Sequence, residues 1–375
     1  MLCAPNVFSA MATDSTGAIP STAQTDDTDA AVRFEYRPVD LRTTPKVELH
    51  RHLEGAIRLA TVFDLSKRAG LPLPADSPEE LGRHALIREP VGSLEEALRA
   101  FAFAQNSVRT HDAVRRIARE AVEDLDDEGV RLAELRFSPE SLCAPGRLDW
   151  DGAMEAVREG VSEAIDGGRD VAVGLIAIFS RDYGMDSARR TVEFALRHRD
   201  DLVGFDIAGS ELGYPPSLYA EVIAPLRGSG LGLTTHYGES GPPEYPGEAV
   251  EVLGPSRLGH GLSVSRDPDV TALVVERGVT LEMCPTSNWL TKGVATVDQH
   301  PIHDLLGRGA RVTLNTDDPG LMGIDLVHEW QVARDRIGFT DGDFRAVTRN
   351  ALAASFLPEE IKADVRRRHF GWIDP

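Results

Sequence analysis

The stretch Val47–Gly55, VELHRHLEG, places two histidines one residue apart directly after a short apolar run. Successive side chains of a β-strand point to opposite faces, so His50 and His52 point the same way if this stretch is a strand. One interpretation is structural, a strand that ends in exposed polar residues. The other is chemical, a pair of imidazoles that faces a metal ion. The pattern of the remaining chain distinguishes the two.

Eight short segments rich in Val, Ile, Leu and Phe follow one another from about residue 45 onward, and most end in polar or small residues. Helix-like stretches, with apolar residues at three- and four-residue spacing, lie between them. This alternation predicts a parallel (β/α)8 barrel of the TIM type, with extra helices after the first strand. The segments are 46–50, 130–138, 171–180, 202–210, 230–238, 257–263, 279–287 and 311–319.

A doubly wound open sheet is the alternative for such alternation. An open sheet concentrates its functional residues at one switch point, and the first segment is not followed by a G-x-G-x-x-G motif. Here His and Asp residues lie at or near the carboxyl ends of four segments, 46–50, 230–238, 257–263 and 311–319. A barrel builds its active site at that end of its strands, so the distribution favours the barrel.

The acidic composition excludes several classes of partner. The 375-residue chain has 40 basic and 60 acidic residues, a formal net charge of −20. Binding to nucleic acid or to an anionic membrane surface requires a basic footprint, so neither is predicted. No apolar run approaches the length of a membrane span.

Cysteine usage and the N-terminal composition bear on compartment and domain organisation. The three cysteines, Cys3, Cys143 and Cys284, form neither a disulfide framework nor a CxxC motif, which favours a reducing cytoplasm. Residues 1–40 are rich in Ser, Thr, Ala and Asp, typical of a disordered tail. We expect one domain, the barrel, over 41–375.

Several polar residues converge on one mouth if the barrel forms. Three histidines and one carboxylate are a natural ligand set for zinc or another divalent ion, with one coordination position left for water. Such an ion lowers the pKa of water and so creates a nucleophile. Each residue alone has a structural explanation, such as a helix cap for the two aspartates. Their joint placement favours a metal site among His50, His52, His236, Glu239, His260, Asp317 and Asp318.

Six sequence blocks resemble the adenosine deaminase family of the metal-dependent amidohydrolase superfamily, and they occur in family order. They are PKVELHRHLEGAIR (45–58), GFDIAGSELG (204–213), THYGES (235–240), RLGHGLS (257–263), EMCPTSN (282–288) and TLNTDDPG (313–320). The resemblance implies one zinc ion per chain. Its implied ligands are His50, His52, His236 and Asp317.

The resemblance also implies the roles of the residues that handle a purine. Glu239 matches the acid that protonates ring nitrogen N1, and His260 the residue that orients the nucleophile and is a candidate base. Asp318 matches a hydrogen-bond partner of N7, and the Gly209 amide a partner of N3. His52 and Glu54 also match substrate-contacting positions.

Three departures from the family pattern concern the substrate. Glu54 replaces the usual aspartate that binds the ribose 5′-hydroxyl, and Tyr237 replaces a small residue expected beside the metal. The segment ELGYPP (211–216) is similar to adenine deaminase relatives. The resemblance therefore supports the class of reaction more strongly than the substituent on purine N9.

The resemblance implies an enzyme of purine metabolism. We expect it to deaminate the small molecules adenosine and 2′-deoxyadenosine to inosine and deoxyinosine, with release of ammonia. Another 6-aminopurine, such as adenine, aminodeoxyfutalosine or methylthioadenosine, is the first alternative. An amide or phosphoester hydrolase with a carbamylated lysine is disfavoured because 202–210 contains no lysine. A catalytically inactive binding protein is disfavoured because no ligand is lost. The sequence predicts no oligomeric state.

Overall fold

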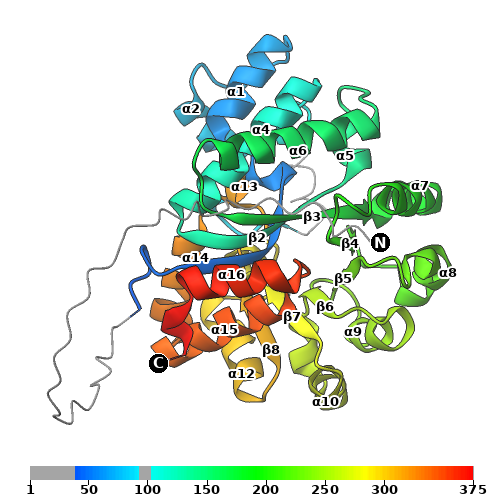
Figure 1. Ribbon diagram of the computed structural model, residues 1–375, viewed down its shortest axis with the longest axis vertical. Helices are drawn as coiled ribbons and strands as arrows, with labels where there is room; N and C mark the ends of the chain where they lie inside the picture. Colours follow the sequence, from blue (N-terminus) through cyan, green and yellow to red (C-terminus); the bar gives the residue numbers. More distant parts are fainter. Residues whose placement is uncertain (1–38, 93–102, 375) are drawn as a thin grey trace, which may run out of the picture.

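The computed structural model describes residues 39–92 and 103–374 (Figure 1). Residues 1–38 of the predicted tail lie outside this part of the chain, so their disorder stays a prediction. The assignment of 41–375 to a single domain also stays a prediction. Among the described residues, no helix has the length and apolar character needed to span a bilayer.

Eight parallel strands form the centre of the molecule, and each pairs with the next along the chain. The predicted (β/α)8 fold class is thereby confirmed. The strands are β1 (Lys46–His52), β2 (Val130–Phe137), β3 (Ala172–Ser180), β4 (Gly204–Ala208), β5 (Gly232–Tyr237), β6 (Arg257–His260), β7 (Thr280–Met283) and β8 (Arg311–Leu314).

The barrel closes where the chain just after β8 meets β1. The Asp317 amide donates to the His50 carbonyl (2.9 Å), and the His52 amide donates to the Asp317 carbonyl (3.0 Å). A parallel bridge between Arg51 and Asp317 marks the same seam. The backbones of three predicted metal ligands, His50, His52 and Asp317, thus form the seam of the barrel.

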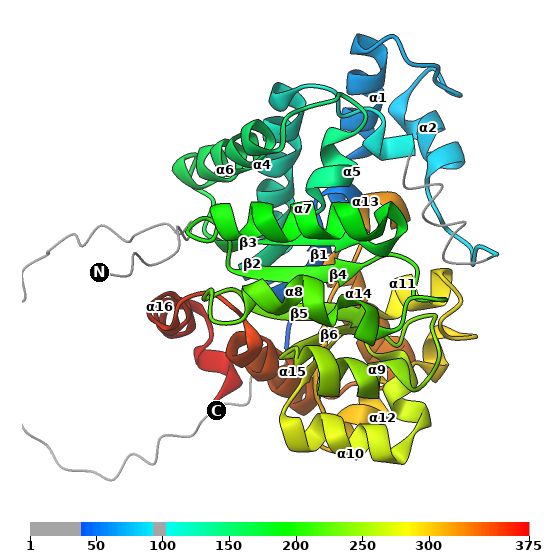
Figure 2. The same cartoon turned by 90° about the vertical axis from the view of Figure 1, so that its right-hand side faces the viewer.

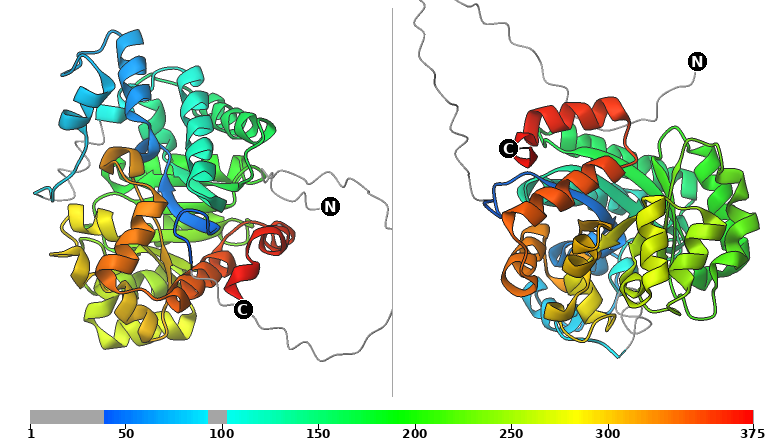
Figure 3. Two further views of the ribbon diagram at one scale, coloured as in Figure 1. Left: turned by 90° about the vertical axis from the view of Figure 1, so that its left-hand side faces the viewer. Right: turned by 90° about the horizontal axis from the view of Figure 1, so that it is seen from below.

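Helices surround the strands, as Figure 2 shows from the side. The extra helices predicted after the first strand are present as α1, α2 and α4, and the late helix α15 packs on β8 and β1 (Figure 3). The described helices are α1 (Leu59–Arg68), α2 (Pro78–Ala85), α4 (His111–Asp127), α5 (Pro139–Cys143), α6 (Trp150–Asp166), α7 (Gly184–Arg197), α8 (Ala220–Ile223), α9 (Tyr245–Glu248), α10 (Pro268–Arg277), α11 (Pro285–Leu290), α12 (Ile302–Gly307), α13 (Pro319–Met322), α14 (Leu326–Val332), α15 (Asp341–Ala354) and α16 (Glu359–His369).

The strand ends differ from the predicted bounds. β1 continues to His52, whereas β6, β7 and β8 stop three to five residues earlier than predicted. Gly261 adopts a left-handed conformation with φ of 64°, which turns the chain away after His260. Pro285 and Pro319 begin short helices, because proline suits the first turn of a helix. The early ends leave polar residues in loops at the barrel mouth.

Charged side chains occupy the barrel interior below the mouth. Arg136 from β2 donates to Asp206 of β4 (2.7 Å) and to Glu282 of β7 (2.8 Å), and all three are fully buried. Burial alone raises the pKa of Glu282, but Arg136 and Arg257 outweigh burial and hold it well below its usual range. Two carboxylates beneath the mouth are therefore ionised and fixed in place.

Candidate metal centre and active site

Three histidines and one aspartate meet at the barrel mouth. His50 and His52 come from β1, His236 from β5, and Asp317 from the loop after β8. Asp317 Oδ1 lies 3.4 Å from His50 Nε2 and 3.2 Å from His52 Nε2, and the Nε2 atoms of His52 and His236 are 3.3 Å apart. One atom from each residue lies within 4.8 Å of the others, as a common metal ion requires.

Carboxylates behind the histidines orient their rings. His50 Nδ1 lies 2.7 Å from Glu282 Oε2, and His236 Nδ1 lies 3.1 Å from Asp206 Oδ1. Because an ionised carboxylate only accepts, each Nδ1 carries the hydrogen, and each Nε2 offers a lone pair to the centre. His50 Nε2 is buried without a hydrogen-bond partner among the described residues. Burial lowers the pKa of His236 to about 3, so it is neutral. The donor set fits a divalent cation.

Asp317 is held in a constrained geometry. Its φ is +67°, and His260 has φ of +62°, both rare for residues with a side chain and concentrated at functional sites. Ser287 Oγ donates to Asp317 Oδ2 (2.6 Å). Burial alone raises the pKa of Asp317, but the imidazoles of His50 and His52, whose Nε2 atoms lie 3.4 and 3.2 Å from Oδ1, hold it well below its usual range. Asp317 is therefore an anionic donor.

A second group of donor atoms overlaps the first and consists of His50, His260, Cys284 and Asp317. Burial raises the pKa of the Cys284 thiol well above its usual range, and a thiol must lose its proton to bind a metal. His260 Nδ1 is also occupied by Asn288 at 2.9 Å. The first group is the better metal site.

Glu239 and His260 lie side by side next to these donors. His260 Nε2 is 3.6 Å from Glu239 Oε2 and 4.0 Å from Asp317 Oδ2. Thr291 donates to Glu239 Oε1 (3.0 Å). Burial raises the pKa of Glu239, which favours its protonated form. A carboxylic acid beside a metal site can donate a proton to a bound substrate.

Asp318 and Glu54 lie on the β1 side of the mouth. A Cβ at Gly55 would be 1.8 Å from Asp318 Oδ1, so the side chain of Asp318 covers that glycine. Burial raises the pKa of Asp318 well above its usual range. Glu54 Oε1 accepts from the Ser138 amide (2.9 Å), and burial raises the pKa of Glu54 to about 7.

The loop after β4 places Gly209 under tight constraint. Its φ is +87°, and a Cβ there would be 2.2 Å from Asp182 Oδ2, so glycine is required. The Gly209 carbonyl accepts from Arg181 Nη1 (2.9 Å). This bond fixes the peptide backbone at the end of β4, where the sequence predicts a substrate contact.

Tyr237 does not lie beside the metal donors, in contrast to the expectation from the sequence. Its hydroxyl donates to the Tyr214 carbonyl (3.2 Å), and Arg181 lies 4.1 Å above its ring. Neighbouring residues of a strand point to opposite faces, so His236 points into the barrel and Tyr237 points outward. Because the Tyr237 side chain points away from the barrel interior, it does not fill the space beside the metal donors.

Glu211 was missed as a site residue, although it lies in ELGYPP. Its Oε1 accepts from the amides of Glu239 (2.8 Å) and Ser240 (3.0 Å), and its Oε2 accepts from the Gly238 amide (2.8 Å). The buried Glu211 therefore fixes the loop that presents Glu239. The sequence could not predict this role, because almost every residue has a backbone amide and no sequence pattern shows which amides a side chain binds.

We expect the Glu211→Ala variant to lose about 3 kcal/mol of unfolding free energy, because three backbone amides, those of Gly238 and Glu239 buried, lose a carboxyl acceptor. Urea denaturation followed by circular dichroism measures the change. The Glu221→Ala variant, on the exposed side of α8, is the control and should stay within about 0.5 kcal/mol of the parent. Equal stabilities for the two variants would show that the loop does not depend on Glu211.

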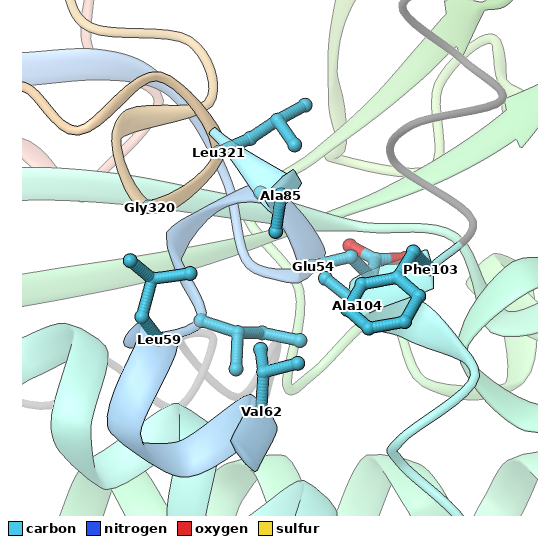
Figure 4. Close-up of a pocket in the computed structure, with 10 residues that line it drawn as sticks. Glu54, Leu59, Val62, Ala85, Phe103, Ala104, Gly320 and Leu321 are labelled. Atoms are coloured by element: carbon cyan, nitrogen blue, oxygen red, sulfur yellow. The ribbon is translucent and has the colours of Figure 1, made fainter. Parts of the chain in front are cut away.

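A mostly apolar pocket adjoins Glu54. Figure 4 shows the Glu54 carboxyl group near Phe103, with Leu59 and Val62 of α1 on another wall. The pocket therefore offers apolar surface and one buried acid. The residues that line the pocket are Glu54, Gly55, Ile57, Leu59, Val62, Ala85, Phe103, Ala104, Gly320 and Leu321.

The chain matches the adenosine deaminase family over residues 45–369. An adenosine deaminase of Shewanella denitrificans is 36% identical over 318 residues, which cover 85% of this chain and 96% of the relative. Among solved structures, adenine deaminase from Arthrobacter aurescens has a TM-score of 0.82 at 27% identity and covers 89% of this chain and 100% of its own. A Zn-bound cog1816 amidohydrolase of Burkholderia ambifaria has a TM-score of 0.81 at 27% identity, with 91% and 95% covered. The extent of these matches shows that the chain belongs to the adenosine deaminase family and is a hydrolytic deaminase of purine amines.

Proposed function

We propose that the chain deaminates adenosine and 2′-deoxyadenosine with one zinc ion held by His50, His52, His236 and Asp317. Water replaces the 6-amino group, and the products are inosine or deoxyinosine and ammonia. The observation that carries the proposal is a buried acid, Glu239, next to a complete metal donor set. The identity with a relative named adenosine deaminase and the zinc bound in the Burkholderia structure support it.

The proposed roles follow from the chemistry of the purine ring. Zinc would lower the pKa of water and so supply the nucleophile for carbon 6. Addition at that carbon disrupts aromaticity, and Glu239 eases it by protonating N1. Burial favours the protonated form of Asp318, which would donate to N7, and the Gly209 amide would donate to N3. His260 would orient the incoming oxygen by a hydrogen bond.

The test is turnover by the zinc-loaded full-length chain. Ammonia release from adenosine and 2′-deoxyadenosine should exceed release from adenine and 5′-modified nucleosides, and metal analysis should give one zinc per chain. The outcome against the proposal is adenosine turnover slower by orders of magnitude than that of another 6-aminopurine. Two metal ions per active chain would contradict the proposed metal site.

A second candidate is deamination of adenine or another 6-aminopurine. Its support is Glu54, which replaces the aspartate that the family uses at the 5′ end of the ribose, together with the similarity to the Arthrobacter adenine deaminase. Glu54 is already engaged by the Ser138 amide, which draws its carboxyl group toward the start of α5. The same substrate comparison distinguishes the two candidates.

A pair of substrates tests whether Glu54 contacts the 5′-hydroxyl. If it does, the parent enzyme should prefer adenosine over 5′-deoxyadenosine by about 10-fold or more in kcat/KM at a pH above the Glu54 pKa of about 7, because a hydrogen bond to a charged group contributes about 1.5–3 kcal/mol. The Glu54→Ala variant should treat both nucleosides alike while keeping its zinc. If the preference persists in Glu54→Ala, another residue recognises the 5′ end.

A further inference from the structure

We propose that His300 and Asn288 are positioning residues that fix the tautomer of His260. In this arrangement neutral His260 carries its hydrogen on Nε2 and acts as a hydrogen-bond donor at the reaction site. The inference rests on the proposed function only for the role of His260 in catalysis. The three side chains come from three different parts of the barrel mouth, namely the end of β6, helix α11 and the turn before α12.

Two backbone amides set the direction of the hydrogen bonds. The Ile302 amide donates to His300 Nδ1 (3.3 Å), so the hydrogen of neutral His300 is on Nε2. His300 Nε2 then donates to Asn288 Oδ1 (3.1 Å). The Cys284 amide donates to the same oxygen (3.4 Å), which independently identifies it as the carbonyl oxygen of the side chain. The Asn288 amide group therefore has one orientation.

The last step determines the tautomer of His260. Asn288 Nδ2, which can only donate, lies 2.9 Å from His260 Nδ1, so this nitrogen must be the acceptor. The hydrogen of neutral His260 is consequently on Nε2. Nε2 lies 3.6 Å from Glu239 Oε2 and 4.0 Å from Asp317 Oδ2, so the hydrogen faces the region between the acid and the metal donor.

Burial makes this arrangement persistent. His260, Asn288 and His300 have exposed fractions of only 2%, 0% and 4%. Burial, with a smaller effect of His260, lowers the pKa of His300 to about 3, so His300 stays neutral at the pH values at which the protein is handled. A neutral His260 that already has a hydrogen on Nε2 cannot accept a proton there. The arrangement favours a donor role for His260 over the alternative role as a base.

The tautomer can be measured directly by ¹⁵N NMR on the zinc-loaded chain with labelled histidine. The His260 signals are assigned by their loss in His260→Gln. We expect a pyridine-type shift for Nδ1 and a pyrrole-type shift for Nε2. A pyrrole-type Nδ1 would overturn the inference. This measurement does not depend on the substrate, so a failure of the proposed function leaves it intact.

The Asn288→Asp variant reverses the last hydrogen bond. Its carboxylate still accepts from Cys284 and His300 but cannot donate, so the hydrogen of His260 should move to Nδ1. We expect kcat to fall by at least about 100-fold, since a wrong histidine tautomer in a hydrolase costs up to about 10⁴-fold. KM and zinc content should change little. An unchanged kcat together with an unchanged ¹⁵N pattern would refute the assignment.

Variants of His300 separate this role from simple packing. Glutamine can still donate to Asn288, so His300→Gln should keep kcat within a few-fold of the parent. Leucine cannot donate, and His300→Leu should lower kcat about 10-fold with a smaller change in KM. His303→Gln, on the exposed side of the adjacent helix α12, is the matched control. Equal loss in the glutamine and leucine variants, with the parent tautomer retained, would contradict the proposal.

Discussion

The Glu239→Gln variant is expected to lose about 10³-fold in kcat while zinc still binds at one equivalent per chain. General acid catalysis typically contributes about 10²–10⁴-fold, and glutamine has the shape of the acid but no proton to transfer. Thr291 Oγ1 can still donate to the amide oxygen that replaces Glu239 Oε1, so the side chain should keep its place. The loss should appear in kcat and much less in KM.

The pH dependence gives the same prediction a second readout. Because burial raises the pKa of Glu239, the protonated acid persists to higher pH than an exposed carboxyl group allows. Activity of the parent should therefore fall as pH rises through that pKa, and the residual activity of Glu239→Gln should lack this limb. The Glu244→Gln variant, exposed in the same loop, is the control. A near-parental kcat for Glu239→Gln would show that Glu239 is not the general acid.

The elements that could be predicted from sequence are those with a periodic or positional signature. Two histidines at i and i+2 predicted a shared face, and β1 indeed presents His50 and His52 to Asp317. The alternation of eight apolar segments with helices predicted the barrel. Strand ends were predicted poorly from β6 onward, because the turn at Gly261 and the helices that begin at Pro285 and Pro319 end each strand within the predicted segment.

The supporting residues could not be predicted, because their partners are far away in the chain or lie in the backbone. Arg136 meets Glu282, which is 146 residues away, at the centre of the barrel. Glu211 is recognised only by the amides that it accepts from. His300 acts through Asn288 on His260 at the end of β6, which lies 40 residues earlier in the chain. Such roles become visible only when the closed barrel sets the direction of each hydrogen bond.

The Asp317→Asn variant is expected to lose zinc. Asp317 is the anionic member of the donor set, and its replacement by a neutral amide of the same shape leaves three histidines. Since loss of a residue that merely orients a ligand typically costs about 10–100-fold in metal affinity, loss of the ligand itself should cost more than about 100-fold. Zinc content after dialysis should fall well below one equivalent, and turnover should disappear with it.

The fold should survive this substitution, because the barrel closes through the backbone of residue 317 and not through its side chain. Circular dichroism should therefore match the zinc-free parent. Ser287→Ala, which removes only the hydrogen bond to Asp317 Oδ2, should lower zinc affinity by about 10-fold. Asp335→Asn makes the same substitution at an exposed residue and is the control, with zinc affinity expected to match the parent.

One further variant distinguishes the two overlapping donor groups, since both contain His50 and Asp317. Cys284→Ser changes only the group that includes His260, so one equivalent of zinc and parental turnover are expected. Loss of zinc from Cys284→Ser would show that the second group, which contains Cys284, binds the metal. Retention of zinc at the parental affinity by Asp317→Asn would contradict both groups, because Asp317 belongs to each of them.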